Sequence, residues 1–123
     1  MEELSAIKLV VNKSRFFSHL YSIEDPNQVE ELLKSHRGKY KKANHHCFAF
    51  RIDGEGSFKN DGEVGHPGQV LLEILRREEL DSHCLMVSRI FGGVKLGVGG
   101  VSRAFKEAGD AVLEEFRKKD SHP

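Results

Sequence analysis

The sequence predicts an α+β fold, a two-layer sandwich in which three helices cover one face of a four-stranded sheet, in the order β-β-α-β-α-β-α. Three observations predict it. Stretches rich in β-branched and aromatic residues alternate with stretches of helical periodicity. Proline stands at the expected start of two helices, at Pro26 and Pro67. The 123 residues suffice for one domain, 1–123, with one hydrophobic core. The second face of the sheet is expected to be open or covered only by loops.

The first half of this pattern is a hairpin followed by a helix. Residues 6–11 and 15–23 carry strand patterns, and residues 12–14 form a plausible turn between them. A helix then begins after Asp25, which can cap it, with Pro26 in the first helical position and Gln28 as a capping-box partner. Gly38 is expected to end this helix.

The second half adds two strands and two helices. Residues 46–52 form a strand with Phe48 and Phe50 on one face and Cys47 and Ala49 on the other. Residues 53–66 are expected to be a polar, glycine-rich loop without regular structure. A helix begins at Pro67, and residues 83–91 form a strand that is apolar on both faces and therefore central. The last helix is expected over residues 101–118.

The composition limits the classes of function. Nineteen basic and nineteen acidic residues leave no net charge, so any contact with nucleic acid must use a local basic patch. No apolar run is long enough for a membrane helix, and the first residues do not resemble an export signal. Two cysteines are too few for a disulfide framework. These features predict a cytoplasmic protein with reduced thiols.

A glycine-rich segment between the last strand and the last helix is the first candidate site. Lys95 lies among five glycines, which are Gly92, Gly93, Gly97, Gly99 and Gly100. Glycine permits close backbone approach, and backbone N–H groups near a helix start can bind an anion such as phosphate. The segment has neither the register of a Walker A loop nor that of a dinucleotide site. A tight strand-to-helix connection is the alternative interpretation.

Two further clusters contain residue types used in catalysis or metal binding. Asp61 and Glu63 can act as acid and base or bind a metal, although Asp61-Gly62 is also common turn chemistry. His45-His46-Cys47 and His83-Cys84 contain zinc ligands and a potential thiol nucleophile. Adjacent strand residues point to opposite faces, however, and no zinc-site spacing is present. We expect neither a metal nor a cofactor.

A run of cations is the fourth candidate. Residues 37–42 place four cations around Tyr40, which suits phosphate contact combined with base stacking. Cations are also favoured after a helix C-terminus, so a solvated loop is an equal alternative. If the third and fourth strands pair side by side, Arg51 and Arg89 could both lie near the glycine-rich segment.

Four motifs, taken together, resemble the Impact/YigZ family over about residues 8–116. They are Lys13-Ser14-Arg15-Phe16, Asn44-His45-His46-Cys47-Phe48-Ala49-Phe50-Arg51, Asp61-Gly62-Glu63 and Val87-Ser88-Arg89-Ile90-Phe91-Gly92-Gly93-Val94-Lys95-Leu96-Gly97. The order and the spacing of the motifs fit the N-terminal domain of that family. Ile90 stands where the family usually has tyrosine or tryptophan.

The resemblance implies a fold like the second domain of ribosomal protein S-five, including a left-handed βαβ unit. It also implies a role near translation, because eukaryotic members bind the activator of a kinase that phosphorylates an initiation factor. The expected function is a non-enzymatic regulatory or binding module that contacts RNA, the ribosome or a translation-regulator protein. The binding residues would be Arg15, Arg51, Arg89 and Lys95, with the glycines Gly92, Gly93, Gly97, Gly99 and Gly100.

Two alternatives belong to other classes. A small enzyme acting on a phosphorylated metabolite or nucleotide would use His45, Asp61 and Glu63 as acid–base groups. A protein-interaction domain would bind no nucleic acid at all.

Overall fold

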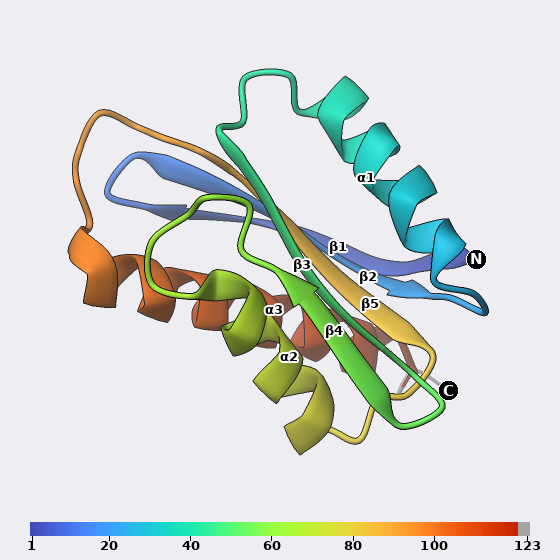
Figure 1. Ribbon diagram of the computed structural model, residues 1–123. Helices are drawn as coiled ribbons and strands as arrows, with labels where there is room; N and C mark the ends of the chain where they lie inside the picture. The colour runs from blue at the N-terminus through green and yellow to red at the C-terminus, as the bar shows by residue number, and fades with distance from the viewer. Residues whose placement is uncertain (121–123) are drawn as a thin grey trace.

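The structure, a computed structural model, describes residues 1–120 and confirms the α+β class (Figure 1). It contains three helices and five strands, one strand more than predicted. The elements in chain order are β1 (Glu2–Val11), β2 (Ser14–Ser22), α1 (Asn27–Lys39), β3 (His45–Ile52), β4 (Glu55–Lys59), α2 (Pro67–Arg77), β5 (His83–Ile90) and α3 (Gly97–Asp120). None of these helices combines the length and the apolar character that crossing a membrane requires.

The strands form one sheet in the order β1-β2-β5-β3-β4, with every neighbouring pair antiparallel. The prediction that residues 83–91 form a central strand is therefore confirmed. β2 and β3 flank β5 and run parallel to each other, so β2, α1 and β3 make a βαβ unit with β5 between its strands.

The helices occupy both faces of the sheet, which differs from the prediction. α2 and α3 cover one face over the larger core, whereas α1 packs on the other face (Figure 1). The α1 side contains a second cluster that includes Tyr21, Phe48 and Met86 from three adjacent strands. Since these strands are apolar on both faces at this point, the second face requires its own cover. The face predicted to be open is therefore covered by α1 and is exposed only where α1 does not reach.

The predicted loop over residues 53–66 contains β4, which is a correction. Asp53 and Gly54 both have positive φ, as a two-residue hairpin turn requires, and they join β3 to β4. All five residues of β4 are exposed, so the strand shows no burial pattern that the sequence could reveal.

The helix boundaries follow local chemistry. The Asp25 carboxylate accepts the backbone N–H of Asn27 at 2.7 Å, and Gln28 Oε1 accepts the N–H of Glu24 at 2.7 Å. Asp25 and Gln28 therefore act at this helix start as predicted, but α1 begins at Asn27, so Pro26 lies one position before the first helical residue. Gly38 does not end α1, which runs on to Lys39. α3 begins at Gly97, four residues before the predicted start.

A network of neutral side chains joins α1 to the sheet. The rings of His36 and His46 both contact Ser88 Oγ, at 2.8 and 2.7 Å from their Nδ1 atoms. Tyr21 Oη lies 2.7 Å from His36 Nε2. Next to them, His19 Nδ1 donates to Glu3 at 2.5 Å, and its Nε2 accepts the hydroxyl of Tyr40 at 2.7 Å.

Burial controls the protonation of these histidines. Desolvation by burial, together with the smaller effects of the neighbouring His19, His46 and Lys39, lowers the pKa of His36 to about 3. Burial also lowers the pKa of His46 and of His19, against the opposing pull of Asp61 and Glu3 respectively. All three rings are therefore neutral at pH 7, and the network is held by hydrogen bonds rather than by ion pairs.

Candidate functional site

The strand register brings the sequence motifs together at one end of the sheet. Arg89 on β5 pairs with His45 on β3, and Ile90 pairs with Arg15 on β2. The turn that carries Glu63 folds back over this end, because Glu63 contacts both Arg89 and His45. We call these residues the signature cluster: Ser14, His45, Asp61, Glu63, Arg89 and Gly92.

A buried ion pair forms the centre of the cluster. Arg89 Nη1 donates to Glu63 Oε2 at 2.9 Å, and the two side chains are only 7% and 4% exposed. Arg89 Nη2 donates to Ser14 Oγ at 3.2 Å, and its guanidinium lies 5.6 Å from the ring centroid of Phe16. The Arg89 side chain is therefore buried, and its guanidinium bonds to other groups of the protein. The sequence does not single out Ser14, although it lies within a motif of the family resemblance.

The Asp61-Gly62 turn orients the second carboxylate. Its residues have positive φ, and the N–H of Glu63 donates to the carbonyl of Asn60 at 3.1 Å. The carboxylate of Asp61 accepts the backbone N–H of His46 at 2.7 Å, and the carbonyl of Asp61 accepts His45 Nδ1 at 2.9 Å. Asp61 and Glu63, two of the three acid–base candidates, therefore serve as hydrogen-bond acceptors within the fold.

Asn60 is a structural residue that sequence reasoning missed. Its Oδ1 accepts the N–H of Gly68 at 2.8 Å in the first turn of α2, and its carbonyl accepts the thiol of Cys47 at 3.2 Å. Burial raises the pKa of the Cys47 thiol far above its usual range, so it is protonated at neutral pH. One signal in the sequence could have identified Asn60. It stands just before the Asp61-Gly62 turn and shortly before a helix that starts with proline.

The two histidine–cysteine pairs do not meet. His45 lies at the signature cluster, whereas His83 pairs with Arg51 at the opposite end of β5. His45 contacts Glu63, but the neighbouring His46 contacts Ser88 on the α1 side, as strand alternation predicts. Within residues 1–120, no group of three or more His, Cys, Asp or Glu side chains is arranged to hold a metal ion.

The predicted basic residues are also separated. β3 and β5 do pair, but they are antiparallel, so Arg51 lies at the far end of the sheet from Arg89 and the glycine-rich segment. This corrects the expectation that both arginines extend one surface. Arg51 Nη1 donates to the carbonyl of Leu75 at 3.4 Å. Arg15 is exposed at the signature end, on the face that α1 occupies.

The glycine-rich segment lies against the first hairpin. A Cβ at Gly92 would lie 2.1 Å from the backbone carbon and oxygen of Lys13, so only glycine fits there. Gly93 and Gly97 have positive φ, and Gly99 and Gly100 lie within the first turn of α3. The close approach predicted for this segment therefore occurs within the protein at Gly92.

Replacing Gly92 with alanine is expected to lower the free energy of unfolding by roughly 3 kcal/mol or more, because the new methyl group must displace backbone rather than a mobile side chain. Chemical denaturation of Gly92→Ala and Gly38→Ala makes the comparison. Gly38 serves as the matched control, because a methyl group there would meet no atom within 4 Å. Equal stability of the two variants would contradict the tight contact at Gly92.

Two cavities flank Arg89 and Phe91. One, of about 330 Å³, is lined by Asn44 and His45 as well as by these two residues. The other, of about 300 Å³, is mainly apolar and lies at the start of α3. Its lining comprises Val64, Arg89, Phe91, Lys95, Leu96, Gly97, Val98 and Val101. Lys95 is exposed at this second cavity, where it can meet a ligand.

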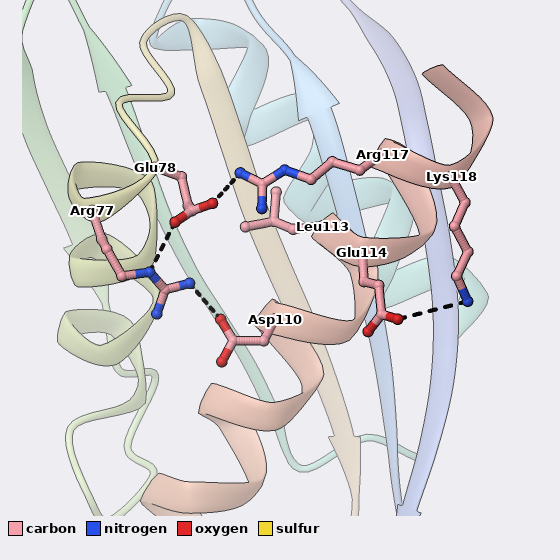
Figure 2. Close-up of a pocket in the computed structure, with 7 residues that line it drawn as sticks. All are labelled: Arg77, Glu78, Asp110, Leu113, Glu114, Arg117 and Lys118. Atoms are coloured by element: carbon pink, nitrogen blue, oxygen red, sulfur yellow. Dashed lines mark hydrogen bonds and ion pairs between the residues drawn. The ribbon is translucent and has the colours of Figure 1, made fainter. Parts of the chain in front are cut away.

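A larger hollow, of about 730 Å³, lies between the end of α2 and α3 (Figure 2). Its charged groups are already paired: Arg77 donates to Glu78 and Asp110, and Arg117 donates to Glu78 (Figure 2). None of its lining residues belongs to a sequence motif. Exposed pairs of this kind contribute up to about 1 kcal/mol each, so we assign the hollow to the helix–helix contact and not to the site.

Comparisons with known proteins agree with the motifs. The Impact N-terminal domain model matches residues 12–113. The IMPACT family member YvyE of Bacillus subtilis is 31% identical over 109 residues, which cover 85% of this chain and 50% of YvyE. This chain therefore spans about half the length of that relative.

Two solved structures share the fold. The crystal structure of a hypothetical protein has a TM-score of 0.85 and 26% identity, and the match covers 90% of this chain and 57% of that one. The two-domain translational regulator Yih1 has a TM-score of 0.54 and 23% identity, with 94% of this chain and 45% of Yih1 covered. The matched domain model and the assembled motifs lead to one conclusion: the chain belongs to the Impact N-terminal domain family.

Proposed function

We propose that this chain is a regulatory module of translation in the cytoplasm that acts by holding a partner protein rather than by catalysis. The observation that carries this proposal is the exposed apolar rim beside the signature cluster, which we define as Val64, Phe91, Val94 and Val98. Three of the four, Val64, Phe91 and Val98, line one cavity with Arg89, and Val94 lies in the chain segment between Phe91 and Val98. These four are among only seven large hydrophobic side chains exposed in the described residues, and Phe91 is 47% and Val98 61% exposed. Such a concentration of exposed apolar surface is typical of a protein contact.

The chemistry of the cluster favours binding. A general acid or base needs to reach a substrate proton, but the Glu63 carboxylate is buried against Arg89, and Asp61 accepts a backbone N–H. Cys47 is a buried, protonated thiol. Arg89 lines the same cavity as Phe91 of the rim and Lys95 of the glycine-rich segment, so the buried ion pair lies directly beside this surface. The structural likeness to the two-domain translational regulator Yih1, beside the match to the Impact N-terminal domain, supports the link with translation.

A cell-free translation assay with a matched pair of variants tests the proposal. The purified chain is expected to change the rate of protein synthesis, and Phe91→Ser is expected to remove that effect. Phe58→Ser is the control, because Phe58 is similarly exposed, at 41%, but lies on β4 outside the rim. Co-sedimentation of the chain with components of the extract, before and after nuclease treatment, shows whether the partner is protein or RNA. Binding to a protein partner survives the nuclease. If both variants behave like the parent chain, the rim is not the contact surface.

A further inference from the structure

A basic face lies on the opposite side of the sheet from the apolar rim. Lys8 on β1 pairs with Phe17 on β2, so these cross-strand neighbours share the face that α1 occupies. The ring of Phe17 stacks on Tyr40 at the C-terminal end of α1, with the centroids 4.4 Å apart and the planes 20° from parallel. We define the basic face by this aromatic pair and five exposed cations, which are Lys8, Arg15, Lys39, Lys41 and Lys42.

The charge of this face is not neutralised. Residues 4–23 and 32–50, which supply it, contain eight Lys and Arg residues and no Asp or Glu. The carboxylate of Glu3, which borders this face, accepts a hydrogen bond from His19. None of the five cations forms an ion pair with a residue of the described range 1–120, although other cations such as Arg77 and Arg89 do. A chain with no net charge therefore concentrates positive potential here.

The aromatic pair is held in place. The hydroxyl of Tyr40 donates to His19 Nε2 at 2.7 Å, and Lys39 Nζ lies 5.5 Å from the centroid of the Tyr40 ring. Both rings remain partly exposed. Cations around a fixed aromatic platform suit a ligand that alternates phosphates with accessible planar bases. A duplex hides its base faces, and an acidic protein segment would use the cations without the planar bases that stack on the platform.

We propose that the basic face binds single-stranded RNA, with phosphates at the five cations and bases packed against Phe17 and Tyr40. The choice of RNA over DNA rests on the proposed function in translation. The site itself does not, because the apolar rim lies on the other side of the sheet.

Fluorescence anisotropy with a labelled 12-nucleotide single-stranded RNA, measured over a salt series, tests this site in the intact chain. Each phosphate contact with a single strand contributes about −0.7 to the slope of log K against log salt, so Lys39→Gln/Lys41→Gln/Lys42→Gln should flatten the slope by about 2. Phe17→Leu keeps an apolar side chain but removes the stack, and should weaken binding roughly five- to 150-fold.

The matched charge control is Arg103→Gln/Lys106→Gln/Lys119→Gln, which removes three exposed cations from α3 on the other side. It is expected to leave the affinity within about twofold, and thermal melting confirms that each variant folds. No binding at low salt, equal weakening by both triple variants, or tighter binding of duplex RNA would overturn the proposal. Tighter binding of single-stranded DNA would overturn the choice of RNA. Phe91→Ser should bind RNA as tightly as the parent chain. The proposed role of the rim in translation and the proposed RNA site on the basic face can therefore fail independently of each other.

Discussion

Replacing Arg89 with alanine is expected to lower the free energy of unfolding by about 3–5 kcal/mol, because the change leaves the Glu63 carboxylate buried without its cation. Within residues 1–120, the Glu63 carboxylate would then retain the N–H of Val64 at 3.1 Å and His45 Nε2 at 3.5 Å. Ser14 Oγ loses a donor at the same time. Urea denaturation of the variant and the parent chain measures the difference.

Two further variants separate the ion pair from a general effect of removing arginine. Arg15→Ala removes an exposed arginine from the neighbouring strand and is expected to cost less than about 0.5 kcal/mol. Arg89→Met/Glu63→Leu replaces both charges with apolar groups and should recover most of the lost stability, since a buried pair is often no more stable than well-packed hydrophobic side chains. A loss for Arg89→Ala no larger than that for Arg15→Ala would show that the pair is not buried as described.

Acidification between pH 6.5 and pH 5 is expected to destabilise the protein steeply. His36 has a pKa of about 3 in the folded state, below its ordinary value of 6.5, because its ring is buried. Between pH 6.5 and pH 3, the His36 ring is therefore protonated in the unfolded chain but neutral in the folded chain. The contribution of His36 is complete above pH 6.5 and falls by up to about 1.4 kcal/mol for each pH unit, until pH 3. His19 and His46, whose pKa values are also lowered by burial, steepen the loss.

Denaturation curves at several pH values, for the parent chain and for His36→Leu, check this effect. The variant is expected to be less stable at pH 7, because Tyr21 and Ser88 lose a partner. The informative quantity is the slope of the free energy of unfolding against pH. In the variant this slope should be smaller by the amount that one bound proton contributes, about 1.4 kcal/mol per pH unit. Ordinary carboxylates titrate below this range and do not mimic the effect. Identical slopes for the two proteins would mean that the pKa of His36 is the same in the folded and unfolded states, so that burial does not lower it.

The parts of the fold that the sequence predicts are those governed by local pattern. β5 is central because it is apolar on both faces, and α2 begins at Pro67 as expected. β4 is not predicted because its residues are all exposed, although Asp53-Gly54 is a strong hairpin signal. The predicted start of α3 is late because three of its first four residues, Gly97, Gly99 and Gly100, have low helix propensity.

The features that the sequence does not predict depend on long-range register. The apolar stripe of α1 shows that it packs against something, but not against which face of the sheet. The apolar character of both faces of β5, and of β3 beside it, indicates in the sequence that each face needs a cover. Arg89 and Glu63 are 26 positions apart, and only the fold of the turn over the sheet end makes them partners. Sequence therefore suggests reactive groups where the structure has an internal ion pair.

The position of β5 also determines when the sheet can be completed during synthesis. β2 and β3 each pair with β5 and not with each other, so the two hairpins that precede it have no common strand until residue 90 is available. A nascent chain that has exposed β1 to β4 carries two unsatisfied inner edges, which are open to wrong pairing. Because the closing contacts join distant parts of the chain, folding is expected to be a late and cooperative event.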